Sequence, residues 1–140
     1  MTIPVWVLLA FAGWTLLTLT STVGLYRWGH ILTGRASLSE WNPDLPQGSD
    51  WYRRAMRAHM NCVENLPVYG AIVVALVASG TTGPSLDVLA IVLIVARVCQ
   101  TLLHIGTRPG EFTAGLRFTF FFVQLICMLA MGGIVVARAL

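Results

Sequence analysis

Residues 54–78 read RAMRAHMNCVENLPVYGAIVVALVA, and the two halves of this stretch differ sharply in polarity. The first half carries two arginines, a histidine, two asparagines and a glutamate, whereas the half that begins at Leu66 is almost wholly apolar. An ionised side chain exposed to lipid is costly, so a membrane helix directs such groups toward water, protein or a ligand. The polar half of this stretch is therefore where a function is to be sought.

The rest of the chain has the composition of a membrane protein. It has 140 residues, of which 56% are hydrophobic and 11% charged, and its mean hydropathy is +0.75. About 20 apolar residues cross the roughly 30 Å of bilayer hydrocarbon, and four segments approach that length. We expect an all-α integral membrane four-helix bundle forming a single domain over residues 1–140. The expected helices cover about 4–28, 51–79, 85–106 and 115–138.

Arginine placement predicts the orientation of the chain. The first segment lacks a positive n-region and an A-x-A-like site, so we expect a retained helix rather than a signal peptide. Residues 29–50 are expected to form a polar loop after it. By the positive-inside rule the basic connections face the cytoplasm and both termini face away, in a membrane of bacterial inner-membrane type. The basic residues on that side are Arg27, Arg35, Arg53, Arg54, Arg57, Arg108 and Arg117, against Arg138 on the other.

Three polar stripes follow from helical spacing. At helical periodicity the polar residues of the second segment lie within an arc of about 100°. These residues are Arg53, Arg54, Arg57, Asn61 and Glu64. The third segment repeats the pattern with Arg97, Gln100, Thr101 and His104. The fourth segment adds Arg117 and Gln124. This excess of guanidinium groups favours an anionic ligand with several carboxylates.

Two structural alternatives remain open at this point. Glu64 and Arg97 could pair as a buried ion bridge that fixes helix register. The arginines near Arg53 could form a solvated cap in contact with lipid phosphates. Metal binding is not expected, because Cys62, Cys99 and Cys127 are widely separated and form no Cys/His ligand spacing.

The motif Arg57-Ala58-His59-x-Asn61-x-x-Glu64-x-x-Pro67 resembles the second-helix signature of the MAPEG superfamily, the membrane-associated proteins in eicosanoid and glutathione metabolism. The likeness extends to the length, the four apolar segments, and the arginines of the third and fourth helices. It implies a homotrimer of four-helix protomers that binds glutathione, as co-substrate, between subunits near the cytoplasmic side. The implied partners are glutathione, a hydrophobic small molecule or lipid, and membrane lipids, with no nucleic acid.

The resemblance also implies roles for individual residues. Arg57, Asn61 and Glu64 would hold the polar ends of glutathione, and Arg117 resembles the helix-four arginine that contacts the thiol. The implied glutathione-binding set is completed by Arg97, Gln100 and His104. Gln100 and His104 fall where some members place a histidine and a tyrosine, and no tyrosine occurs after Tyr69. This departure puts tyrosine-assisted chemistry in doubt.

The favoured hypothesis is a membrane-bound glutathione-dependent transferase or peroxidase acting on hydrophobic electrophiles or lipid hydroperoxides. A guanidinium beside a thiol lowers the pKa of that thiol and raises the fraction present as nucleophilic thiolate. The alternative is a non-catalytic protein of the same kind that binds a lipid or a thiol. A small transporter or channel would also use inward polar faces, but the ionisable residues cluster toward one end of the helices.

His59 lies off the polar stripe and is interpreted as a structural hydrogen-bonding residue.

Overall fold

The computed structural model describes residues 1–41 and 48–139, and in this part of the chain it is all-helical. Its elements are α1 (Ile3–Thr18), the π-helical turn η1 (Leu19–Gly24), α2 (Leu25–Leu32), the 3-10 turn η2 (Leu38–Glu40), α3 (Asp50–Ala78), α4 (Pro84–Gly106) and α5 (Glu111–Ala139). Four helical stretches are long and apolar enough to cross a membrane, the first being the continuous run Ile3–Leu32. The prediction of an all-α, four-span membrane bundle is confirmed.

Two helices differ in extent from the sequence prediction. The first span continues to Leu32, into residues expected to be loop, and His30 Nδ1 lies 2.9 Å from the carbonyl of Tyr26 one turn earlier. The last helix begins at Glu111 rather than near residue 115, because an acidic side chain in a first turn complements the positive helix end. Part of the polar loop expected over residues 29–50 lies outside the described residues.

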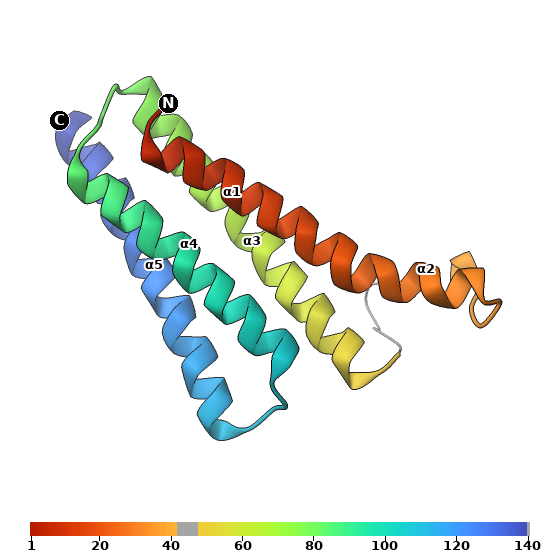
Figure 1. Ribbon diagram of the computed structural model, residues 1–140. Helices are drawn as coiled ribbons and strands as arrows, with labels where there is room; N and C mark the ends of the chain where they lie inside the picture. The colour runs from red at the N-terminus through yellow and green to blue at the C-terminus, as the bar shows by residue number, and fades with distance from the viewer. Residues whose placement is uncertain (42–47, 140) are drawn as a thin grey trace.

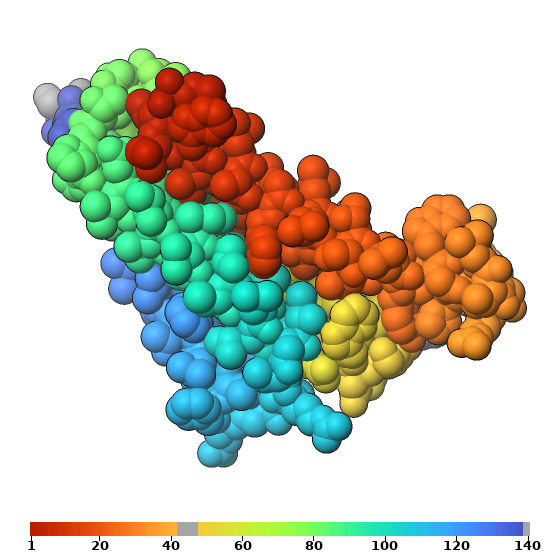
Figure 2. All heavy atoms as spheres, viewed as in Figure 1, coloured from red at the N-terminus to blue at the C-terminus, as the bar shows by residue number. Residues whose placement is uncertain are grey.

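The helices run antiparallel along the length of the molecule (Figure 1). Both termini and the α3–α4 connection lie at one end, and the α4–α5 connection lies at the other end. α1 packs against both α3 and α4, while α5 packs mainly along α4. The space-filling view shows the first span extending beyond the other helices at the α2 end (Figure 2).

A row of threonines allows the first span to approach its neighbours closely. Thr15, Thr18 and Thr22 are buried, and each hydroxyl donates to the carbonyl four residues earlier. This local bonding satisfies the hydroxyls inside an apolar environment. On the facing helix α3, Ala55 and Ala58 are fully buried, so small side chains line both sides of the contact.

The apolar core occupies the half of the bundle nearer the termini. It consists of Val7, Phe11, Cys62, Tyr69, Val73, Leu76, Leu86, Ala90, Leu93, Cys127, Met128 and Met131. Within it the hydroxyl of Tyr69 donates to the carbonyl of Pro4 at 3.0 Å, which ties α3 to the start of α1. The arginine-rich half of α3 lies beyond this core, toward the opposite end.

Replacing Tyr69 by phenylalanine is expected to lower the free energy of unfolding in detergent by about 1 kcal/mol, because it removes one buried hydrogen bond without changing packing. Denaturant titration followed by circular dichroism measures the change. Tyr26→Phe is the control, since the Tyr26 hydroxyl accepts from the exposed Ser49 amide and water can replace that bond. A loss for Tyr26→Phe as large as for Tyr69→Phe would contradict this interpretation.

Candidate functional site

The charged side chains of the bundle gather at the end opposite the termini. Arg53, Arg54 and Arg57, from the start of α3, line a cavity of about 270 Å³ together with Asp50 and Pro109. At the other end of the molecule Arg138 Nη1 donates to the carbonyl of Thr82 at 2.7 Å. The two ends of the bundle thus differ in charge as the sequence predicted.

The candidate site residues of α3 lie on an open face of the chain. The side chains of Arg57 and Glu64 are exposed, and that of Asn61 is half-buried. Since α3 is one of the four candidate membrane spans, this exposure places ionisable groups on a surface that lipid alone would solvate poorly. The face therefore needs water, a ligand or another subunit against it.

On α4 the corresponding residues point into the bundle instead. Arg97 is 1% exposed, its Nη1 donates to Gln100 Oε1 at 3.1 Å, and its guanidinium carbon lies 5.4 Å from the ring centre of Phe11. Nε and Nη2 of Arg97 are buried and have no hydrogen-bond partner among the described residues. Arg97 is thus a buried cation held by an amide and an aromatic face.

Two glutamines connect α4 to α5. Gln100 Nε2 donates to the backbone carbonyl of Arg117 at 3.0 Å. Gln124 Nε2 donates both to Gln100 Oε1 at 3.0 Å and to the carbonyl of Phe120 at 2.7 Å. Gln100 therefore fixes the turn of α5 that carries Arg117. The sequence placed Gln124 on the polar face of the last helix but did not assign it to the site.

His104 lies where three helices meet. Its Nε2 is 3.3 Å from Asn61 Nδ2, which joins α4 to α3. The positive charges of Arg57, Arg97 and Arg117 all act on its imidazole, that of Arg117 most strongly. The structure thus brings the predicted residues of α3, α4 and α5 into one cluster, with Arg97 on its inner side and Arg57 on its outer side.

The Glu64–Arg97 ion bridge that the sequence left open is not formed. Over residues 1–41 and 48–139 the structure has one ion pair, between Arg53 and Asp50. Glu64 is exposed while Arg97 is buried, so the two side chains occupy different environments. Glu64 acts on Arg97 only at a distance, and none of the cluster's arginines forms a direct ion pair in the described residues.

The three tyrosines hold the fold rather than the cluster. Tyr52 accepts from Arg27 Nε at 2.7 Å, Tyr69 donates to Pro4, and Tyr26 accepts from the amide of Ser49.

Phe11, which lies against Arg97, was not identified from the sequence, because an apolar residue on an apolar helix carries no distinguishing signal. His59 lies beside the backbone of Thr15 of α1, and its Nδ1 has no hydrogen-bond partner in the described residues, so its structural role stays a prediction.

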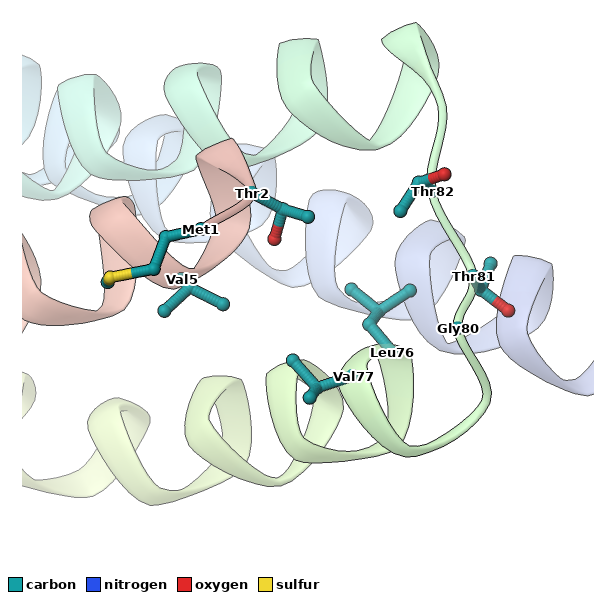
Figure 3. A pocket seen from close by; sticks show the side chains of 8 residues that line it. All are labelled: Met1, Thr2, Val5, Leu76, Val77, Gly80, Thr81 and Thr82. Atoms are coloured by element: carbon teal, nitrogen blue, oxygen red, sulfur yellow. The ribbon is translucent and has the colours of Figure 1, made fainter.

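A second hollow, of about 370 Å³, lies near the termini and is lined mainly by apolar side chains (Figure 3). Val5, Leu76 and Val77 form its walls, and Thr2, Thr81 and Thr82 lie at its polar edge. None of its lining side chains is ionisable. Among the described residues, no group of three His, Cys, Asp or Glu side chains could hold a metal ion.

The fold and the cluster define a multi-pass helical membrane protein with a basic, partly buried site. Comparison with known families agrees, since the model of the MAPEG family matches residues 4–137. The chain belongs to the MAPEG family, whose members are membrane-associated proteins of eicosanoid and glutathione metabolism. No curated protein and no solved structure matches it.

Replacing Gln100 by leucine is expected to lower the free energy of unfolding by about 2–3 kcal/mol, because it strands the buried Nη1 of Arg97. Gln124→Leu is the matched control and should cost about 1 kcal/mol, since the Arg97–Gln100 bond survives it. Chemical unfolding in detergent measures both values. Equal losses of unfolding free energy for the two variants would show that the Arg97–Gln100 bond contributes no more to stability than the bonds of Gln124.

Proposed function

We propose that the protein is a membrane-bound glutathione-dependent transferase or peroxidase that activates the glutathione thiol for attack on hydrophobic electrophiles or lipid hydroperoxides. The observation that carries this proposal is the convergence of Arg57, Arg97 and Arg117 on His104 without a carboxylate paired to any of them in the described residues. Such a cluster attracts an anion. Glutathione supplies two carboxylates, one ammonium and a thiol that can ionise.

The polar ends of glutathione match the exposed residues of α3. Arg57 suits a carboxylate, Glu64 suits the ammonium, and both side chains are accessible. The half-buried side chain of Asn61 lies one helical turn from each of them. A second copy of the chain against this face would enclose the ligand and remove the charges from lipid, which supports sites between subunits; the subunit number proposed, three, follows the family resemblance.

Arg117 is the proposed activating residue. Its Nη2 donates to Thr113 Oγ1 at 3.3 Å, and its backbone is held by Gln100, so its position is fixed from two sides. A guanidinium near sulfur stabilises the thiolate over the thiol. In the transferase reaction the thiolate sulfur bonds to the electrophilic carbon as the leaving group departs with the bonding electron pair.

The hydrophobic acceptor would arrive from the bilayer. Phe118, Phe121 and Phe122 follow Arg117 on α5 and are exposed, and the rings of Phe118 and Phe122 lie 4.9 Å apart. This aromatic surface beside the activating residue suits an apolar electrophile or a lipid hydroperoxide. The arginine-rich end is proposed to face the cytoplasm of a bacterial-type inner membrane, with both termini on the other side.

A second candidate is a non-catalytic member that binds a thiol or a lipid. The observation in its favour is that all three tyrosine hydroxyls are engaged elsewhere in the fold. Arg117 is then the one strong donor proposed for the sulfur. Binding without turnover would result if that donor alone does not ionise the thiol.

Arg117→Ala is expected to abolish the ultraviolet thiolate absorbance that saturates as glutathione is titrated into the purified protein. Lowering a thiol pKa by about 2 units corresponds to ~2.7 kcal/mol of stabilisation, which the guanidinium can supply at short range. Arg117→Lys is the charge-preserving control and should retain part of the signal. The transferase proposal would be overturned for this thiol by the absence of binding at millimolar glutathione.

Arg57→Ala and Glu64→Ala are each expected to abolish glutathione binding in calorimetry while the oligomer survives detergent extraction. Both side chains are exposed and neither forms an ion pair in the described residues, so their removal breaks no direct contact between charged groups there. Arg53→Ala is the control, because Arg53 is already paired with Asp50. Dissociation of the oligomer in either variant would instead assign the two residues to subunit packing.

A further inference from the structure

The buried nitrogens of the cluster without a partner in the described part of the chain include Arg97 Nε and Nη2 on its inner side, and His104 Nδ1 and Arg117 Nε nearer its open side. Arg117 is also the arginine whose charge acts most strongly on the His104 imidazole. Buried polar atoms in native proteins are nearly always hydrogen-bonded. An arginine nitrogen only donates, while a neutral imidazole has one nitrogen that accepts. The donor Arg117 Nε and an unprotonated His104 Nδ1 are therefore complementary, and Arg117 is the arginine that acts most strongly on this ring.

We propose that Arg117 Nε–H donates to His104 Nδ1, so that His104 is the positioning residue for the activating guanidinium. The inference rests on the proposed function for its catalytic meaning, but the pairing itself does not require glutathione. This hydrogen bond would satisfy both buried atoms at once. His104 then acts on the substrate through Arg117 and is not itself a donor to the sulfur.

The contact between His104 and Asn61 determines which nitrogen of the ring carries the proton. Nδ1 must be unprotonated to accept, so Nε2 carries the hydrogen and donates to the side-chain oxygen of Asn61. The oxygen and nitrogen of a side-chain amide are interchangeable by rotation, so the 3.3 Å contact at Nε2 accommodates this arrangement. A doubly protonated imidazole would instead present a hydrogen toward the donor of Arg117.

The pairing leaves one edge of the guanidinium for the substrate. Nε is directed to His104, and Nη2 donates to Thr113. Nη1 is not among the buried unpartnered atoms and has no hydrogen bond within the described residues, so it is accessible. The chain Asn61–His104–Arg117 thus crosses α3, α4 and α5 and directs Nη1 outward. It gives Asn61 a positioning role in place of a direct contact with glutathione.

The first test is nitrogen NMR of the detergent-solubilised protein labelled at histidine, with the His104 signals assigned by their loss in His104→Gln. The expected result is an unprotonated Nδ1 and a protonated Nε2. In Arg117→Ala the Nδ1 signal should shift, because its donor is gone, while the signals of His30 stay in place. A protonated Nδ1 in the intact protein would overturn the proposal.

The second test separates positioning from simple packing. His104→Phe keeps the ring volume and removes the acceptor, so the pKa of bound glutathione should rise by about one unit, a roughly tenfold change in thiolate ratio. His104→Gln retains an acceptor and should restore most of that loss. His30→Phe is the matched control outside the cluster. Equal thiolate signals in the Phe and Gln variants would overturn the positioning role.

The two measurements distinguish failure of this inference from failure of the proposed function. A protein that shows the expected His104 nitrogen pattern but no thiolate signal retains the Asn61–His104–Arg117 chain and is not a glutathione-activating enzyme. A protein that forms the thiolate with unchanged strength in His104→Phe is such an enzyme without this positioning residue. If His104→Phe does not assemble, the NMR result on the intact protein decides.

Discussion

A guanidinium buried inside a membrane protein without an ion pair among the described residues constrains much of this structure. Arg97 is 1% exposed, its Nη1 donates to the oxygen of Gln100, and its guanidinium lies over the ring face of Phe11. Moving an unpaired charge out of water is expensive, so the bundle must supply dipoles in place of counter-ions. That requirement accounts for two glutamines deep between α4 and α5, where apolar side chains would otherwise pack.

The same requirement fixes the geometry of the site. Gln100 Oε1 must adopt a defined rotamer to accept a hydrogen bond from Arg97. In that rotamer the amide nitrogen of Gln100 donates to the carbonyl of Arg117. The position of α5 along α4 is thereby tied to the buried charge. On the other side, Asn61 reaches His104 one turn beyond Gln100, which ties α3 to the same helix. α4 is therefore the element from which the other functional helices take their register.

The sequence predicted the spans and the polar faces because both depend on local periodicity. Arg57, Asn61 and Glu64 share one side of a helix wherever that helix packs. The sequence did not predict that Arg97 turns inward while Arg57 stays exposed, since the rotation of each helix is set by packing against its neighbours. Nor did it predict the contact with Phe11 or the Asn61–His104 pair, which join residues far apart in the chain. The ion bridge between Glu64 and Arg97 was a reasonable alternative from the sequence, and it is not formed among the described residues because Glu64 is exposed while Arg97 is buried.

The proposed chemistry follows from a balance between thiolate fraction and thiolate reactivity. Each added donor to sulfur lowers the pKa of the thiol, but the intrinsic nucleophilicity of a thiolate falls with its pKa, with a Brønsted coefficient of about 0.4–0.5. A site with one guanidinium donor and no tyrosine hydroxyl would hold a smaller fraction of thiolate, and each ion would be a stronger nucleophile. Such a site is best suited to reactive apolar electrophiles, whose attack requires little assistance to the leaving group. In the proposed arrangement His104 places the single donor and adds no second hydrogen bond to the sulfur, so it would preserve that reactivity.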